Sequence, residues 1–292
     1  MTTRLDAQFA FLNEADRLKS VLRANVLMDG SRAENSAEHS WHVALWALVF
    51  QGHAPARTSV HRVISMLLLH DLVEVDAGDH PIHLPNPGQS DAEAAAALRL
   101  FGLLPPDQGA ELLALWQEFE AGISPDAAWA KVLDHAHPLF QVLCAAQPRA
   151  DHLQIVRDNL ATGRAADLAM RWPEAHNAAL ARLINIAPQA SGFEQIITFL
   201  AEADAPKSVT RATTLCDGSR FENSAEHSWH IALYALILAD QAGPGVDISR
   251  VIQMLLLHDL VEIDVGDVPI HSAGGQAHGS ADVQAAESMA AR

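Results

Sequence analysis

The stretch Glu34–His42 reads ENSAEHSWH, and the same nine residues recur at Glu222–His230. The string is rich in imidazole and carboxylate groups, which bind protons and divalent metal ions. Its recurrence so far along the chain indicates that the sequence repeats a whole structural unit together with its chemistry.

The repeated sequence extends well beyond these nine residues. The segment that starts at Phe11 aligns with the one that starts at Phe199, and VISMLLLHDLVEVDAGDHPIH from Val63 aligns with VIQMLLLHDLVEIDVGDVPIH from Val251. The alignment needs no net gap between its two ends. A period this long is typical of a duplicated domain and not of a solenoid of short repeats.

The two copies differ in length. The sequence predicts a complete domain over residues 1–188 and a second, partial copy over residues 189–292. The second copy ends in DVQAAESMAAR, which resembles DAEAAAALRLF of the first copy, so nothing in it corresponds to residues 101–188. We therefore expect the partial copy to lack the last helices of the domain.

Composition limits the classes of protein to consider. The 292 residues are 49% hydrophobic and 19% charged, which favours a folded chain with a substantial core. The net charge of −17 repels polyanions, so we expect no nucleic acid as a main partner, although one local cationic site can still hold a small phosphorylated substrate. Cys144 and Cys216 form no ligand pair and are typical of a reduced, cytoplasmic protein. We find no signal peptide and no apolar run of about 18 residues, so no membrane association is expected.

Apolar residues recur at spacings of three and four along the chain, which predicts an all-α fold. Asn35 or Ser36 is expected to cap the start of a buried helix, with Glu38 completing a capping box. A second, strongly apolar helix is predicted over residues 60–76, followed by a loop rich in Gly and Pro. Further helices are predicted over residues 91–103, 107–121, 125–146 and 173–186.

Four side chains of the first copy are candidates for a metal site: His39, His70, Asp71 and Asp134. Imidazole and carboxylate groups are common ligands of divalent ions, and ligands from three separate helices would leave positions open for water and substrate. A single histidine on an apolar helix is more often a core residue than a ligand. The adjacent pair His70 and Asp71 is different, because burying both groups after a Leu-rich run is costly unless they are paired or bound to metal.

These residues resemble the HD superfamily of metal-dependent phosphohydrolases, whose pattern is H…HD…D on an all-α helical bundle. The motifs SAEHSWH, LLLHDLVE and the following Gly-Asp are similar to its 5′-deoxynucleotidase-like branch, over nearly the whole first copy. The resemblance implies a phosphoric monoester hydrolase, 5′-nucleotidase-like, acting on a small phosphorylated substrate such as a (deoxy)nucleoside 5′-monophosphate. It also implies one divalent metal ion, and the sequence does not distinguish Mn, Co, Mg, Zn and Fe.

The resemblance also implies a role for each acidic residue and histidine of the motifs. It makes the four candidate ligands named above the metal ligands. Glu74 matches a carboxylate assigned to catalysis, and Asp79 matches a second acidic residue near the attacking water. His42 shares a helix face with His39 and either supports the site from behind or packs in the core.

Three basic residues are candidates for binding the substrate phosphate. Arg32 can fork onto phosphate oxygens or pair with Glu34 in its own loop. Lys19 is a second candidate. Nucleotidases of this branch carry an Arg-Trp pair that contacts the nucleotide, and Ala24-Asn25 stand there in this sequence with Arg23 adjacent. The stacking aromatic ring is therefore absent.

The second copy keeps most of the acidic and histidine set. The retained residues are His227, His258, Asp259, Glu262 and Asp267. Because it has no counterpart of Asp134, we expect it to bind metal weakly and to serve mainly in packing. Domains of this branch resemble homodimer formers, so the chain either forms a homodimer or imitates one as an intramolecular pseudo-dimer.

Two other functions are compatible with the same residues. One is a non-enzymatic scaffold of the HD type that binds a ligand or a partner. The other is a di-iron HD oxygenase, which needs two further histidines between Asp71 and Asp134. His80 and His83 are the histidines available there, both in one loop, and the second copy has Val268 in place of His80.

Overall fold

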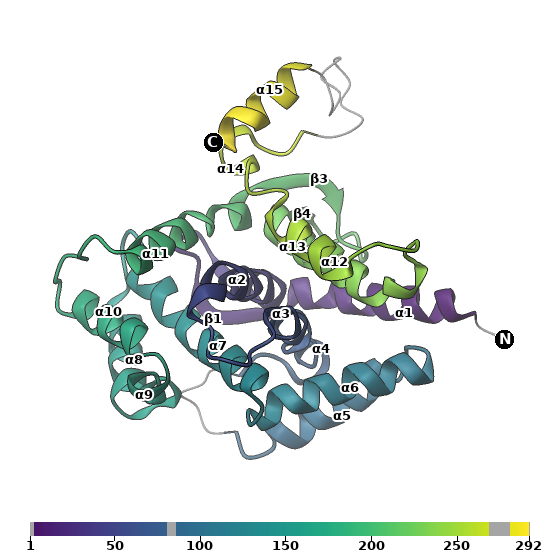
Figure 1. The fold of residues 1–292 in the computed structure, drawn as a ribbon, viewed down its shortest axis with the longest axis horizontal. Coiled ribbons are helices and arrows are strands. Elements are labelled where there is room, and N and C mark those ends of the chain that lie inside the picture. Colours follow the sequence, from purple (N-terminus) through teal and green to yellow (C-terminus); the bar gives the residue numbers. More distant parts are fainter. Residues whose placement is uncertain (1–2, 81–85, 269–280, 292) are drawn as a thin grey trace.

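The computed structural model describes residues 3–80, 86–268 and 281–291, which fold mainly into α-helices (Figure 1). The all-α class predicted from the sequence is therefore confirmed. Within these ranges the β structure is limited to two small antiparallel sheets of two strands each. None of the described helices is long and apolar enough to cross a membrane.

In chain order the α-helices are α1 (Arg4–Ala15), α2 (Ser36–Val49), α3 (Val60–Leu69), α4 (Glu74–Ala77), α5 (Gln89–Phe101), α6 (Pro106–Ala121), α7 (Pro125–Leu143), α8 (Ala150–Thr162), α9 (Leu168–Arg171), α10 (Pro173–Leu183), α11 (Gly192–Glu202), α12 (Ser224–Ile237), α13 (Ile248–Leu257), α14 (Glu262–Val265) and α15 (Ala281–Ala290). Short 3-10 helices are η1 (Asp16–Ser20), η2 (Phe50–His53), η3 (Arg164–Asp167), η4 (Ala205–Ser208) and η5 (Ala239–Gln241). Strand β1 (Leu22–Val26) pairs with β2 (Ala33–Asn35), and β3 (Thr210–Thr214) pairs with β4 (Phe221–Asn223).

Helix α2 is the central helix of the molecule. Every residue from Ser36 to Leu48 is buried, because α3, α7 and α12 surround the helix. The predicted capping box is confirmed. The backbone N–H of Glu38 donates to the Asn35 side chain at 3.0 Å, and the backbone N–H of Asn35 donates to the Glu38 carboxylate at 2.8 Å. The box fixes where the helix begins and thereby places the histidine-rich first turns in the core.

The repeated sequence is accompanied by a repeated order of elements. The series from η1 through β1, β2, α2, η2, α3 and α4 recurs as η4, β3, β4, α12, η5, α13 and α14. Helices α2 and α12 pack directly on each other, and one hydrophobic cluster contains buried residues of both series, including Trp41 and Trp229. Figure 1 shows α15 at the top of the molecule, beyond α14, whereas α6 to α10 lie on the other side, around α7.

The helix that follows the histidine-rich helix is covered differently in the two series. In the first series α6 and α7 pack on α3, and Met66 is only 1% exposed. The equivalent Met254 on α13 is 60% exposed, and Leu257 is 40% exposed where its counterpart Leu69 is fully buried. The described part of the second series therefore leaves open the face that α7 covers in the first.

The structure differs from the sequence-based expectation in local detail. The helix predicted over residues 60–76 ends at Leu69, and a turn separates it from the short helix α4. Gly78 then ends α4 with a φ of 73°, a conformation that favours glycine. Helices α1, α8, α9 and α11 and the four strands were not predicted. The strands are too short, and too irregular in register, to show an alternating pattern.

Candidate metal centre

Three helices bring the four candidate ligands together. His39 lies in the first turn of α2, His70 and Asp71 directly follow α3, and Asp134 lies on α7. The Oδ1 atom of Asp134 is 3.0 Å from Nε2 of His39 and 3.6 Å from Nε2 of His70. Nε2 of His70 is in turn 3.2 Å from Oδ1 of Asp71. The two imidazoles and two carboxylates thus aim their ligand atoms at one point.

His70 is held in the tautomer that a metal site requires. Its Nδ1–H donates to the backbone carbonyl of Leu67 at 2.8 Å, which leaves the lone pair on Nε2. That Nε2 atom is buried and has no hydrogen-bond partner among the described residues. Burial alone would lower the pKa of His70, but the negative charges of Asp71 and Asp134 raise it to about 9.

The other ligand candidates respond to the same burial. Burial and the charge of nearby Arg23 lower the pKa of His39 well below its usual value, so its imidazole is neutral. Burial would raise the pKa of Asp134, but its close contacts with the imidazoles of His39 and His70 lower it well below the ordinary value. Two buried imidazoles, one of them with an orphaned ring nitrogen, and two nearby carboxylates are the donor set of a divalent cation. The ligand atoms of His39, His70 and Asp71 lie close enough together to hold one, so the residues present fit such an ion.

Arg23 is the cation that the structure places beside these acids. Its guanidinium lies 2.8 Å from Oδ2 of Asp71, 3.9 Å from Oε1 of Glu74 and 3.8 Å from Oδ1 of Asp79. Glu74 is held by Ser36, whose hydroxyl donates to Oε2 at 2.5 Å. Burial and the charge of Asp71 raise the pKa of Glu74 well above its ordinary value. The two carboxyls predicted to act in catalysis thus lie next to the candidate ligands.

A pocket of about 490 Å³ opens onto this cluster. His70, Asp71 and Asp134 line it together with Arg23, Glu74 and Asp79. Ala24 and Asn25 also line the wall, so the two residues that replace the Arg-Trp pair do face the pocket. Lys131, His135, His152 and Arg164 supply basic groups on the lining from α7, α8 and η3.

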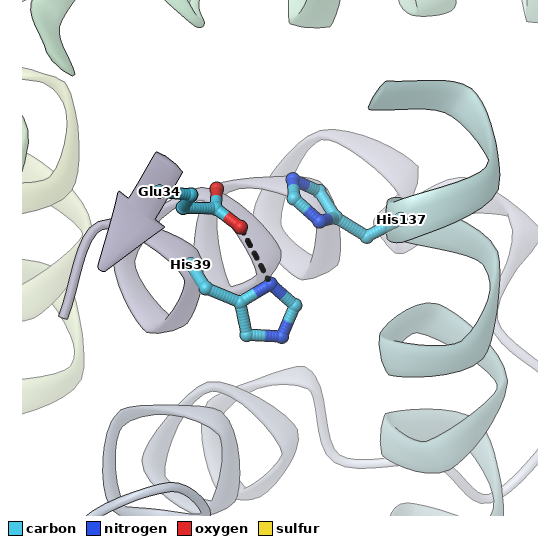
Figure 2. Close-up of side chains that lie close together, drawn as sticks. All are labelled: Glu34, His39 and His137. Atoms are coloured by element: carbon cyan, nitrogen blue, oxygen red, sulfur yellow. Dashed lines mark ion pairs between the residues drawn. The ribbon is translucent and has the colours of Figure 1, made fainter. Parts of the chain in front are cut away.

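Two residues that the sequence analysis did not assign to the site lie behind His39. Figure 2 shows Glu34 from β2 and His137 from α7 pointing toward His39 from α2. Oε2 of Glu34 is 3.7 Å from Nδ1 of His39, and all three side chains are fully buried. His137 lies three residues after Asp134 and therefore on the same side of α7, which is the sequence signal that could have found it. Glu34 belongs to the repeated string itself.

The structure places two of the candidate phosphate ligands elsewhere. Lys19 is 2% exposed and forms ion pairs with Asp16 at 2.7 Å and Glu222 at 3.0 Å. Arg32 pairs with Glu38, not with Glu34, and its guanidinium also donates to a backbone carbonyl of η4. Neither residue lines the pocket, because both are bound between the two repeated series. Of the three basic candidates, only Arg23 lies at the cluster.

The second series forms a similar but more open cluster. His227, His258 and Asp259 lie close enough to hold a metal ion, and Arg211 pairs with Asp259 at 2.8 Å as Arg23 does with Asp71. The His258 side chain is 33% exposed, whereas that of His70 is 2% exposed.

The remaining acids of the second cluster keep the places of their counterparts. Ser224 donates to Glu262 at 2.5 Å, and the guanidinium of Arg211 lies 3.4 Å from Asp267. No described residue of this series takes the position of Asp134.

The loop after α4 bears on the oxygenase alternative. His80 lines the pocket, while His83 lies outside the described residues. The ring of His137 lies 4.9 Å from that of His39, and His135 is the neighbour of Asp134 in sequence, but both follow Asp134 instead of preceding it.

Comparison with known proteins gives the family. The HD domain family model matches residues 15–176 and 203–292, which is most of the chain in two segments. The chain belongs to the HD domain family. Each matched segment contains one histidine-aspartate pair, His70–Asp71 in the first and His258–Asp259 in the second.

Individual relatives carry more specific names. The chain is 30% identical over 134 residues to the 5′-deoxynucleotidase HDDC2 of Homo sapiens, which covers 45% of this chain and 64% of the human protein. It is also 30% identical to the protein of the same name from Mus musculus, of which it covers 66%. The crystal structure of a predicted metal-dependent phosphohydrolase from Magnetospirillum magnetotacticum MS-1 matches with 41% identity and a TM-score of 0.53, over 63% of this chain and 99% of that one. The chain thus spans just under two thirds of the two nucleotidases.

Proposed function

We propose that the chain is a metal-dependent phosphohydrolase that cleaves a phosphomonoester of a small molecule, with (deoxy)nucleoside 5′-monophosphates as the first substrates to test. The observation that carries the proposal is the convergence of His39, His70, Asp71 and Asp134 beside a 490 Å³ pocket, which the last three of them line. The names of the relatives, a 5′-deoxynucleotidase and a metal-dependent phosphohydrolase, support the same class.

The four convergent side chains would hold one divalent cation. When bound, such a cation supplies a Lewis acid that lowers the pKa of a water molecule and offsets the charge of a phosphate group. The chain's own contribution is geometric: Leu67 fixes the tautomer of His70, and the capped first turn of α2 fixes His39. These contacts prepare the site before the substrate arrives.

Arg23 and the two neighbouring carboxyls would act on the substrate. The Arg23 guanidinium is positioned to donate to phosphate oxygens above Asp71. A carboxyl group with a raised pKa, as Glu74 has, holds a proton that it can pass to the leaving alkoxide. Asp79, whose Oδ1 lies 3.8 Å from the same guanidinium, can accept a hydrogen bond from the attacking water and orient it.

The pocket wall bears on the choice of substrate. Ala24 and Asn25 offer no ring on which a base could stack, and the nearest large ring in the lining, Phe119, is only 3% exposed. The polar lining suits the phosphate and a polar leaving group better than it suits a stacked base. We therefore include sugar phosphates and other small phosphomonoesters beside the nucleotides.

The test is release of inorganic phosphate from such a panel by purified protein. The protein is first treated with a chelator, and Mn²⁺, Co²⁺, Mg²⁺, Zn²⁺ or Fe²⁺ is then restored one at a time. We expect no release without a cation and release with at least one of them. Cation binding without release from any substrate would contradict the proposal and favour the non-enzymatic scaffold.

A further inference from the structure

A lysine from the second series reaches the candidate metal centre of the first. Lys207 lies on η4, yet its side chain is fully buried against α2 and β2. Its ammonium group lies 2.8 Å from Oε1 of Glu34 and 3.0 Å from Nδ1 of His42, and it also pairs with Asp204. Burying an ammonium group is costly unless it is fully paired, so this arrangement is a built feature of the fold.

The three contacts use the three N–H donors of the ammonium group. Nε2 of His42 donates to the backbone carbonyl of Leu200 at 2.9 Å, so its Nδ1 atom carries the lone pair that accepts from Lys207. Burial and the charge of Lys207 lower the pKa of His42 to about 3, which keeps the ring neutral. Glu34 and Asp204 accept the other two hydrogens. The lysine therefore has one fixed position and no spare donor.

Glu34 connects this lysine to a candidate metal ligand. One carboxylate oxygen accepts from Lys207, and the other, Oε2, faces Nδ1 of His39 at 3.7 Å (Figure 2). Both Oε2 and Nδ1 lack a hydrogen-bond partner among the described residues. A carboxylate beside the remote nitrogen of a ligand histidine keeps the proton on that nitrogen and directs the other nitrogen to the metal. For His39, that other nitrogen is Nε2, which faces Asp134.

The turn that carries Lys207 is itself fixed by the first series. The backbone N–H of Met28 donates to Asp204 at 2.8 Å. Arg32 donates to the backbone carbonyl of Lys207 at 2.6 Å, and Ser208 donates to Asp29 at 2.7 Å. These contacts hold the backbone on both sides of Lys207, so the lysine is placed by residues of the domain that it supports.

We propose that Lys207 is a positioning residue for the metal centre of the first series, acting through Glu34 on His39. The second series thereby supports the metal centre of the first, in addition to covering its core. This inference rests on the metal centre of the proposed function. It makes that centre depend on Lys207, which lies 173 positions from Glu34 in sequence. Lys207 touches neither the pocket nor the candidate ligands and is not a catalytic residue.

The chain contains a matched control for this lysine. Lys19 on η1 reaches in the opposite direction, to Glu222 at 3.0 Å and Asp16 at 2.7 Å, and Glu222 lies 3.1 Å from Nδ1 of His227. Lys19 is as buried as Lys207 and bridges the same two series, but it supports the cluster for which no described residue takes the place of Asp134. Loss of either lysine leaves buried carboxylates unpaired, so both losses cost stability. Only loss of Lys207 is expected to change the first metal centre.

The test compares Lys207→Met, Lys19→Met and Lys207→Arg in the full chain. Each variant is titrated with Co²⁺ while its visible absorption, which reports the coordination of the ion, is recorded. We expect Lys207→Met to weaken the tighter Co²⁺ site by about 10- to 100-fold and to alter its spectrum. Lys19→Met should leave that site unchanged. Lys207→Arg, which keeps the positive charge, should bind Co²⁺ more tightly than Lys207→Met.

A fourth variant keeps the test valid if Lys207→Met does not fold. Lys207→Met combined with Glu34→Gln removes both charges of the pair, and we expect its Co²⁺ affinity to match that of Glu34→Gln alone, because the lysine acts through Glu34. Equal effects of Lys207→Met and Lys19→Met on the tighter site, or no effect of Lys207→Met, would overturn the inference. Wild-type protein that binds no Co²⁺ would overturn it together with the metal centre. Protein that binds Co²⁺ but releases no phosphate would overturn the hydrolase activity alone.

Discussion

The indole N–H of Trp41 donates to the backbone carbonyl of Leu256 at 3.1 Å, and this bond joins the central helix of one series to the second apolar helix of the other. The reciprocal bond runs from Trp229 to the carbonyl of Leu68, also at 3.1 Å. Leu68 and Leu256 each lie two residues before a histidine-aspartate pair. The two bonds thus tie the packing of the repeated series to the backbone that presents the candidate ligands.

Replacing Trp229 with Phe should destabilise the fold measurably. The change removes the only hydrogen bond that the Trp229 side chain makes among the described residues and deprives the buried carbonyl of Leu68 of that donor, which costs about 1–3 kcal/mol in addition to the lost contact area. The free energy of unfolding from a urea titration measures the effect.

Trp46→Phe is the matched control. Trp46 is as buried as Trp229, but its indole N–H has no partner among the described residues. The control therefore loses ring area without losing a hydrogen bond and should cost less than Trp229→Phe. Equal losses in the two variants would mean that the bond to Leu68 adds nothing to stability.

Asp71→Asn should lower phosphate release by about 100-fold or more. The change removes the negative charge of a candidate ligand, while the amide retains the size of the side chain and can still accept from Arg23. Asp259→Asn is the equivalent change at the second cluster, where the described residues offer no counterpart of Asp134, and should keep most of the activity. Steady-state rates at saturating Mn²⁺ give the comparison. Similar losses in both variants would show that the second cluster takes part in the reaction.

The local sequence was enough to predict the four convergent side chains, because each lies on or directly after one of three helices that the apolar pattern predicts. His39 follows a capping box, and His70 and Asp71 end an apolar helix. The placement of Lys19 and Lys207 could not be predicted in the same way. Their partners lie in the other series, and the contact exists only once the two central helices have packed together. Lys19 therefore reads from sequence as an ordinary surface lysine.

The structure was also needed to tell which acid pairs with Arg32 and which acid supports the metal centre. Arg32 lies two residues before Glu34 and six before Glu38, and either pairing is compatible with the sequence. The turn into α2 brings Glu38 to Arg32 and leaves Glu34 free to face His39 and Lys207. Backbone geometry at the start of α2 decides which acid pairs with Arg32, and the periodicity of the sequence does not indicate it.

Arg23→Lys should raise the KM for a phosphomonoester by about 10-fold, with a smaller change in kcat. Lysine keeps the positive charge but cannot fork onto two phosphate oxygens, and one charge-assisted hydrogen bond contributes about 1.5–3 kcal/mol. Competitive inhibition by inorganic phosphate should weaken in parallel. Arg211→Lys changes the equivalent residue at the second cluster and should leave both constants unchanged. An unchanged KM in Arg23→Lys would assign the arginine to charge balance at Asp71 instead of substrate binding.

Removing divalent cations should lower the thermal stability of the wild-type protein. A cation that binds only the folded state stabilises it by about 2.7 kcal/mol when its concentration is 100 times Kd, and a chain of this size then gains roughly 5–10 °C in Tm. Asp134→Asn should lose most of this gain, because Asp134 is the candidate ligand on α7 and faces both His39 on α2 and His70 after α3. Asp267→Asn, at the second cluster, serves as the control and should keep the full gain. Scanning calorimetry with chelator and then with Mn²⁺ measures each difference. A gain in Asp134→Asn equal to that of the wild type would place the bound cation away from α7 and contradict the four-ligand centre.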